Sequence, residues 1–426
     1  MRALWSKYLA IQDWKASNGA LLDGVNYANV VATSLYQSGG RSQLRRAVYA
    51  LFYSWRIVSG SKSGEVLVFY SHRDKHRRDY DYIVDYLIEA AEDRGALVEL
   101  HDHFSPIQPF RTLGFWPSGW RATRTLHLDA LERLTTSLLI ARYRSARSAL
   151  GQHIVGHDIV ATFSDALPWD NLVAQLAGLA GLPSITAQHG QYRLLDETNV
   201  SADAEAYANF VSDVMLVWGP ATVDQLTKAG IARVRLVTSG WIREQPRIEQ
   251  ANEGNRPSTF GVVLNGQNGD AGNYMLIRVA ERLASDLDMK YIVRAHPTFG
   301  ARDYARVAHH CAEIRPMPLA DYAGRVSFSL AHASSSTLEL LLAGEVIYVV
   351  DDGTVADVFR HPGLTYSEEE ILGQVRLDLD SPIEARTRLD GLKLWFNDDR
   401  DQASAVRHAL RRRAGRPDRG IDAWGS

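Results

Sequence analysis

From residue 66 onward, short apolar segments typical of buried strands alternate with longer segments of helical periodicity. The first pair is a strand predicted over 66–71 (VLVFYS) and a helix over 76–95, in which Ile83, Tyr86 and Leu87 recur at helical spacing. Strands that alternate with helices form parallel sheets covered by helices on both faces. We therefore predict an α/β protein built from Rossmann-like, doubly wound parallel sheets.

The alternation stops once and then restarts. Residues 243–259 (REQPRIEQANEGNRPST) are polar and contain Pro246, Gly254 and Pro257, a composition typical of a linker. We predict two Rossmann-like domains that face one cleft. The predicted parts are an N-terminal domain over 1–242, the linker over 243–259, a C-terminal domain over 260–398, and a C-terminal helix and tail over 399–426.

Three further segments carry weaker patterns. A long helix is predicted over 123–150, a shorter one over 303–314 (DYARVAHHCAEI) and a last one over 399–413. The first 60 residues do not fit the strand–helix alternation.

Charge and composition exclude several classes of protein. The net charge of −3 argues against a general nucleic-acid-binding protein, which is normally basic. Cys311 is the only cysteine, so no internal disulfide can form. The N-terminus lacks the apolar core of a signal peptide, and no segment approaches the about 20 apolar residues of a membrane-spanning helix. We expect a cytoplasmic protein whose membrane contact, if any, is peripheral.

Polar side chains follow four of the predicted strands. In doubly wound sheets, ligands bind beyond the carboxyl ends of the strands, so these residues are the candidates for a site. They are Ser164 and Asp165; Gln188, His189 and Gly190; His296 and Pro297 after Arg294; and His332 followed by Ser334, Ser335 and Ser336.

The serine run has two interpretations. It stands at the predicted start of a helix, where free backbone amides and the helix dipole favour a phosphate. Ser336 and Glu339 also form an S-x-x-E capping box, which needs no ligand.

The two histidines at strand ends also have two interpretations each. Pro297 restricts the backbone of His296 to extended conformations, and Gly190 next to His189 permits a positive φ and close approach of a ligand. Either imidazole can instead be a structural residue that contacts the backbone at the end of its strand. Residues in loops at strand ends carry function disproportionately, but for either histidine taken alone the structural interpretation is the more common one.

Other motifs give little support for a site. His101 and His103 lie two residues apart on a predicted strand, but no third metal ligand follows nearby, so no metal site is expected. The basic segments 72–79 and 407–416 are typical of solvated helix faces, and the second gives only a weak indication of contact with an anionic membrane surface. Neither a P-loop nor a G-x-G-x-x-G motif after a strand occurs.

The ordered segments ITAQHG, SDVMLVWG, VRLVTSGWI, KYIVRAHP and HASSSTLELLLAG resemble bacterial glycosyltransferases of GT-B architecture that build capsules and related surface polymers. That group includes capsule Kdo transferases, bacterial polysialyltransferases and CDP-glycerol glycerophosphotransferases. The resemblance spans Asp158 to Asp352. One difference is that the family often has proline where this chain has Ala295, in the run from Arg294 to Pro297.

The resemblance implies a role for each candidate residue. Arg294, His296, Pro297 and the three serines would bind the nucleotide and phosphate of a cytidine-nucleotide donor, and Glu339 would reach the ribose. His189, flanked by Gln188 and Gly190, would lie on the acceptor side. A histidine there can accept the proton of a sugar hydroxyl, and Asp165 is the alternative base. No metal or other cofactor is implied, because protein groups neutralise the leaving phosphate in this group of enzymes.

The implied function is transfer of a sugar from a CMP- or CDP-linked donor, such as CMP-Kdo or CMP-sialic acid, to a surface polysaccharide or glycolipid. The resemblance also implies peripheral contact with the inner membrane or with other polysaccharide-assembly enzymes. It implies no nucleic-acid partner. Two alternatives remain: another sugar-nucleotide enzyme, such as a 2-epimerase or pyruvyl transferase, and a non-catalytic nucleotide-sugar-binding partner in polymer export.

Overall fold

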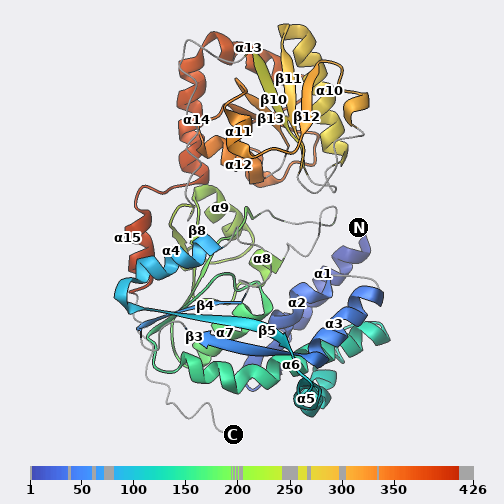
Figure 1. Ribbon diagram of the computed structural model, residues 1–426, viewed down its shortest axis with the longest axis vertical. Coiled ribbons are helices and arrows are strands. Elements are labelled where there is room, and N and C mark those ends of the chain that lie inside the picture. Colours follow the sequence, from blue (N-terminus) through green and yellow to red (C-terminus); the bar gives the residue numbers. More distant parts are fainter. Residues whose placement is uncertain are drawn as a thin grey trace. The chain divides into compact units, whose positions relative to one another are not determined.

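The protein is described by a computed structural model. It covers residues 2–36, 40–59, 64–71, 81–192, 194, 197, 200, 205–241, 258–265, 270–296, 304–332 and 335–411. The chain divides by its internal contacts into two compact units (Figure 1). The first unit comprises Met1–Val217, Leu226–Ile242 and Arg400–Ser426, and the second comprises Trp218–Gln225 and Arg243–Asp399.

The first unit contains a seven-stranded sheet of order β3-β5-β4-β6-β7-β8-β9, in which only β3 pairs antiparallel. Its strands are β3 (Tyr53–Ser59), β4 (Val66–Tyr70), β5 (Gly95–Phe104), β6 (Ile159–Thr162), β7 (Ser184–Ala187), β8 (Val214–Val217) and β9 (Leu236–Thr238). A two-stranded ribbon, β1 (Leu21–Leu22) and β2 (Val25–Asn26), stands apart from this sheet.

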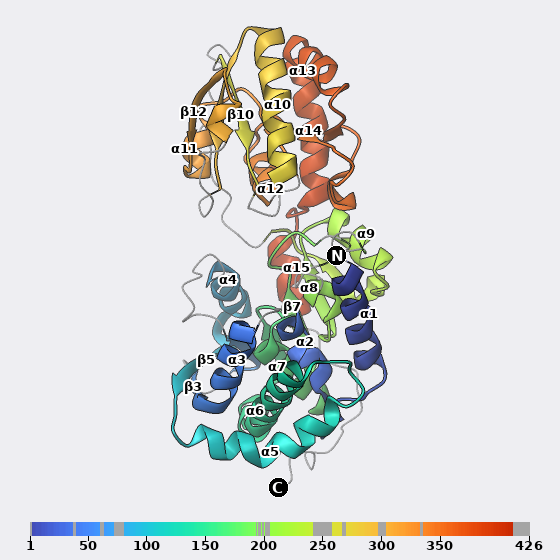
Figure 2. The ribbon, with the colours of Figure 1, turned by 90° about the vertical axis from the view of Figure 1, so that its right-hand side faces the viewer.

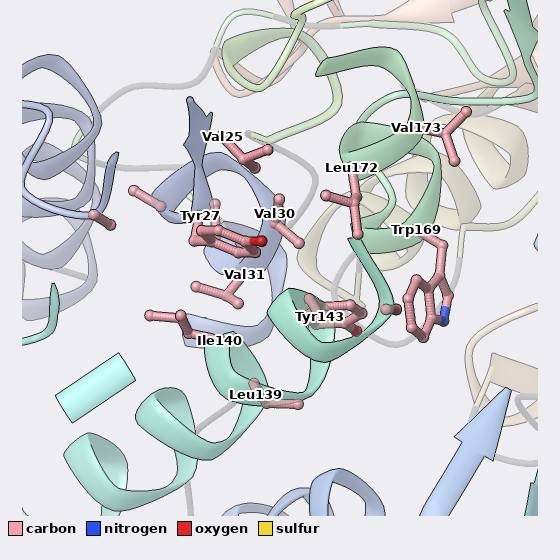
Figure 3. Close-up of a cluster of buried hydrophobic side chains, with 14 of the residues drawn as sticks. Val25, Tyr27, Val30, Val31, Leu139, Ile140, Tyr143, Trp169, Leu172 and Val173 are labelled. Atoms are coloured by element: carbon pink, nitrogen blue, oxygen red, sulfur yellow. The ribbon is translucent and has the colours of Figure 1, made fainter. Parts of the chain in front are cut away.

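Helices lie on both faces of this sheet, for example α6 and α7 on one and α4 and α15 on the other. The helices of the first unit are α1 (Arg2–Ala16), α2 (Tyr27–Leu35), α3 (Gly40–Phe52), α4 (Asp81–Ala91), α5 (Gln108–Ala122), α6 (Ala130–Ile154), α7 (Pro168–Leu179), α8 (Glu205–Ala208), α9 (Pro220–Lys228, shared with the second unit) and α15 (Gln402–Ala409). Side chains alternate along β4: Leu67 packs with α2, α6 and α7, whereas Val66 packs with α4 and α15. Figure 3 shows residues of α2, α6 and α7 from the first of these two clusters. The alternation is the period of two expected for a strand buried on both faces.

One expectation for the first unit needs correction. The helix predicted over 123–150 is α6, which begins at Ala130 because the Asp129 side chain caps it by accepting from the Glu132 amide at 2.8 Å. A separate helix, α5, precedes it. The described part of the first 60 residues forms α1, the β1–β2 ribbon, α2, α3 and the edge strand β3, which agrees with the absence of a strand–helix alternation there.

The second unit contains a six-stranded sheet whose strands are all parallel, of order β12-β11-β10-β13-β14-β15. In chain order this is 3-2-1-4-5-6, the strand order of the Rossmann fold. The strands are β10 (Thr259–Val263), β11 (Lys290–Arg294), β12 (Cys311–Arg315), β13 (Ser329–Ala331), β14 (Ile347–Val350) and β15 (Thr365–Tyr366); the helices are α10 (Asp270–Leu287), α11 (Leu319–Ala323), α12 (Ser335–Leu342), α13 (Ile371–Asp380) and α14 (Pro382–Phe396).

The core of the second unit lies on both sides of β10. Phe260 stacks on Phe328 with 4.9 Å between ring centroids, on the face covered by α10 and α13 (Figure 2). On the other face, Gly261 leaves room for Tyr322 of α11, whose hydroxyl lies 3.0 Å from Ser329 Oγ. The prediction of two Rossmann-like, doubly wound α/β domains is confirmed by the two parallel-dominated sheets.

The helix predicted over 303–314 is wrong. The structure has a short 3₁₀ turn at Tyr304–Arg306 and then the edge strand β12, which pairs parallel with β11. The segment was short and half polar, and pairing with β11 outweighs a weak helical preference. The predicted linker lies outside the described residues except for Ser258 and Thr259.

Candidate functional site

In the first unit, the polar ends of β6 and β7 lie next to each other. The two strands are parallel neighbours, with Thr162 paired to Thr186. Beyond them, the Asp165 amide donates to Thr186 Oγ1 at 3.0 Å. The sequence prediction that Asp165 and the Gln188–Gly190 segment belong to one edge of a sheet therefore describes the geometry of the first unit correctly.

The His189 side chain is half-buried among aromatic rings. Its ring centroid lies 5.5 Å from that of Phe163 and 6.0 Å from that of Tyr192. The preceding Gln188 is buried and donates from Nε2 to the Gly190 carbonyl at 2.9 Å, which fixes the turn after β7. The neighbours of His189 thus restrict its orientation.

Gly190 does not have the backbone conformation that we expected. It is not among the glycines with positive φ, and a Cβ at this position would meet no atom of the described residues within 4 Å. Neither its backbone conformation nor the described residues around it therefore require glycine here.

Asp165 is buried and bound to backbone amides. Its Oδ2 accepts from Val211 N at 2.9 Å and from Ser212 N at 2.8 Å. Burial raises the pKa of this carboxyl, while the two amides act in the opposite direction. These contacts favour a role in holding the 211–212 segment, and they count against Asp165 as the base that receives a substrate proton.

A second buried carboxyl, Asp170, was missed by the sequence analysis. It lies in the first turn of α7, has no exposed surface, and accepts a hydrogen bond from Ser71 Oγ. Burial raises its pKa to about 7, against the opposing effect of the Ser71 hydrogen bond. An aspartate in the first turn of a helix is commonly an ordinary cap, so the segment PWDN gave no signal of an unusual environment.

The surroundings of Asp170 coincide with the point where the strand order of the first sheet changes direction. Ser71 follows β4 and Ser164 follows β6, and these two strands are neighbours although β5 lies between them in sequence. The Ser164 amide lies 3.5 Å from Asp170 Oδ1. Such switch points are the usual ligand sites of doubly wound sheets.

In the second unit, Arg294 and Ser336 are in contact. Arg294 ends β11, and its guanidinium donates to Ser336 Oγ at 3.2 Å and to the Met317 carbonyl at 3.0 Å. Burial lowers the pKa of Arg294, and the nearby Glu339 carboxylate opposes that shift. The structure therefore gathers three of the predicted donor-site residues at the start of α12.

The capping-box interpretation of the serine run is wrong. Helix α12 begins at Ser335, so Ser336 is already inside the helix and cannot be its N-cap. His296 lies two residues beyond the end of β11 and is half-buried. Pro297, Ser334 and the side chain of Ser335 lie outside the described part of the chain.

A polar network crosses the neighbouring strand ends of the second unit. His332 Nδ1 lies 3.2 Å from Asn265 Nδ2, and His332 Nε2 lies 3.0 Å from Asp352 Oδ1. The three residues follow β13, β10 and β14, which are adjacent strands. A Cβ on Gly272 would come within 3.2 Å of the His332 ring, so this glycine allows close packing of α10 against the network. Asn265 and Asp352 were not singled out from the sequence.

Within the described residues, no three His, Cys, Asp or Glu side chains are grouped closely enough to hold a metal ion. On β5, His101 Nε2 lies 3.5 Å from Glu99 Oε2. The described helices also include none that is long and apolar enough to cross a membrane.

Comparison with known proteins gives only distant structural neighbours. No family model matches the chain, and none of the curated proteins does. Among solved structures, an S. aureus MnaA–UDP complex superposes with a TM-score of 0.48 at 11% identity, covering 80% of this chain and 94% of that one. The Neisseria meningitidis UDP-GlcNAc 2-epimerase bound to UDP-GlcNAc gives 0.45 at 11% identity over 81% and 99%.

The calicheamicin glycosyltransferase CalG4 gives a TM-score of 0.45 at 13% identity, over 82% of this chain and 97% of that one. Scores below 0.5 at such identities do not establish a relationship. The fold assignment therefore rests on the strand orders of the two sheets.

Proposed function

We propose that the protein is a glycosyltransferase that moves a sugar from a nucleotide-activated donor to a polysaccharide or glycolipid acceptor. The observation that carries the proposal is the second unit. It has the Rossmann strand order, and Arg294, Ser336 and Glu339 meet at its carboxyl edge, where a helix begins. Nucleotides bind at such edges in proteins of this fold.

The donor is proposed to be CMP- or CDP-linked, for example CMP-Kdo or CMP-sialic acid. Arg294 and the N-terminus of α12 would bind its phosphate, with Ser336 as a further donor of hydrogen bonds. His296 would contact the phosphate or the nucleotide from the end of β11. In the reaction, the bond between the anomeric carbon and the phosphate oxygen breaks, and these groups stabilise the negative charge of the departing nucleotide.

The acceptor is proposed to bind to the first unit. His189 would accept the proton of the attacking hydroxyl as the new glycosidic bond forms, because a neutral imidazole is a competent base near neutral pH. The turn held by Gln188 and the rings of Phe163 and Tyr192 restrict its orientation. Asp165 would support the neighbouring loop rather than take the proton.

The proposal is tested by incubating the purified protein with CMP-sialic acid, CMP-Kdo or UDP-GlcNAc, with and without a bacterial polysaccharide or glycolipid fraction. The products are followed by chromatography and mass spectrometry. A transferase releases nucleotide and extends the acceptor only when both substrates are present.

Other products would identify one of the alternatives. An epimerised sugar nucleotide formed without acceptor would show a 2-epimerase, and acceptor that gains pyruvate from an added activated donor would show a pyruvyl transferase. Tight nucleotide binding without turnover of any donor would indicate the non-catalytic binding role.

A further inference from the structure

Helix α5 of the first unit exposes large apolar side chains and buries small or polar ones, which is the reverse of an ordinary surface helix. Its buried side carries small or polar residues, namely Gln108, Thr112, Ser118, Gly119 and Ala122. Its outer side exposes Phe110 (78%) and Leu113 (47%), and Ile107 just before it is also exposed (60%). A surface helix normally buries its large apolar side chains, so this arrangement needs an explanation.

The inner side of α5 is held in place by specific contacts with α3 and α6. Thr112 Oγ1 donates to the Ala50 carbonyl at 2.9 Å, and Trp116 Nε1 donates to Ser137 Oγ at 2.9 Å. A Cβ on Gly119 would lie 2.2 Å from the Ser137 carbonyl oxygen, which shows how closely α5 approaches α6. Figure 2 shows α5 running along the outside of α6. These contacts therefore hold the apolar side chains of α5 on its outer side.

Further exposed apolar side chains adjoin the start of α5. Phe52, the last residue of α3, stacks on Phe104, the last residue of β5, with 6.1 Å between ring centroids and 7° between the planes. The Ser105 amide donates to the Phe52 carbonyl at 2.8 Å, which joins the end of α3 to the segment that leads into α5. We define the apolar surface as Phe52, Phe104, Ile107, Phe110 and Leu113.

The two segments that build the apolar surface carry charge of one sign, and the nearby Asp102 of β5 is paired with Arg142. The two segments that build it, 40–59 and 104–128, contain seven arginines and no aspartate or glutamate, although the whole chain has a net charge of −3. Arg41 and Arg45 are exposed on α3, and Arg111 and Arg121 are exposed on α5. Apolar side chains flanked by arginines match the interface of a bilayer with anionic headgroups, where the apolar groups insert and the cations attract phosphate.

We propose that the apolar surface and the arginines of α3 and α5 dock the first unit on an anionic phospholipid membrane. The apolar surface contacts the bilayer itself, and no lipid is proposed as a substrate at this surface. The inference rests on this surface alone and does not depend on the donor or on the reaction proposed above. It also places the membrane contact at α3 and α5 rather than at the basic C-terminal segment 407–416.

The test is co-sedimentation of the full chain with vesicles of phosphatidylglycerol and phosphatidylethanolamine, with phosphatidylcholine vesicles for comparison. We expect binding to the anionic vesicles that weakens as salt is raised. The double variant F110S/L113S should lower the partition coefficient at least roughly tenfold, since two apolar side chains no longer insert. Ile383→Ser is the matched control, because Ile383 is equally exposed (78%) but lies on α14 of the second unit.

The electrostatic part of the proposal is tested separately with R111Q/R121Q, against Arg376→Gln, an exposed arginine on α13 of the second unit. The first variant should bind anionic vesicles roughly 30-fold more weakly, since it loses two charges at about 1 kcal/mol each, and the control should bind like the wild type. Thermal unfolding of each variant checks that it is folded.

Three results would overturn the proposal. The first is wild-type protein that does not bind anionic vesicles. The second is folded F110S/L113S that binds them as the wild type does. The third is sedimentation velocity that shows wild-type dimers which F110S/L113S dissociates, because the surface would then be covered by a second copy of the chain.

Discussion

Replacing Asp170 by asparagine should change how the stability of the protein depends on pH. In the fold this carboxyl has no exposed surface and a pKa of about 7, against an ordinary value of 3.8. Because the folded-state pKa is the higher one, the proton is held more tightly in the folded protein. The contribution of Asp170 to stability is therefore greatest below the ordinary pKa and is lost as the pH rises through about 7.

The size of the effect follows from the two pKa values. Between the two pKa values, each rise of one pH unit lowers the free energy of unfolding by about 1.4 kcal/mol. Above the folded-state pKa, the free energy of unfolding no longer falls on account of Asp170. Between about pH 5 and about pH 8, the wild type should lose roughly 2–3 kcal/mol that Asp170→Asn, which cannot ionise, does not lose. The measurement is urea unfolding of both proteins at several pH values, because contributions from all other groups cancel in the difference.

A second variant separates the burial of Asp170 from its hydrogen bond. Ser71 Oγ donates to the Asp170 carboxyl and favours its ionised form, so Ser71→Ala should raise the pKa further and move the loss of stability to higher pH. If the stability curves of wild type and Asp170→Asn run parallel over the whole pH range, the reasoning about this buried carboxyl is refuted.

Three further predictions concern the proposed site and the packing of the first unit. His296→Ala should weaken nucleotide binding by roughly 1.5–3 kcal/mol while the protein stays folded, measured by titration calorimetry; unchanged affinity removes His296 from the site. His189→Ala should reduce transfer by about 10²–10⁴-fold at saturating donor with little effect on donor affinity, whereas Asp165→Asn should act mainly on stability; the opposite pattern in single-turnover rates moves the base to Asp165. Gly119→Ala should destabilise the protein by about 1–3 kcal/mol, since its Cβ would lie 2.2 Å from the Ser137 carbonyl oxygen, and an unaltered melting temperature would contradict this packing.

The fold could be predicted from the sequence where the periodicity of the apolar residues matches their burial in the structure. Strands such as 66–70 and 347–350 are short, continuous apolar runs rich in β-branched and aromatic residues, a pattern typical of strands buried on both faces. Residues 311–315 form an edge strand with polar and half-buried positions, and their local pattern does not distinguish a strand from a helix.

The candidate site was predictable where it depends on topology alone. Arg294 and Ser336 are far apart in sequence, but both lie at the carboxyl edge of one parallel sheet, and the structure brings them into contact. Asp170 could not be found in this way, because its unusual environment comes from Ser71 and from complete burial.

No helix was predicted over Gln108–Ala122, the residues of α5. Its outward apolar side could not have been predicted from periodicity in any case, because periodicity shows that a helix has an apolar side but not whether that side faces the core. In α5, Thr112 and Gly119 face the core instead.

The central claim, that the second unit binds a nucleotide-activated sugar donor, is tested most directly by thermal-shift measurements with CMP, CDP, UDP, GDP and ADP. A ligand that binds only the folded protein raises its melting temperature by mass action. We predict the largest shift with CMP or CDP, and loss of that shift in the folded His296→Ala variant. A shift with UDP and none with CMP or CDP would contradict the proposed donor, and no shift with any nucleotide would contradict the central claim itself.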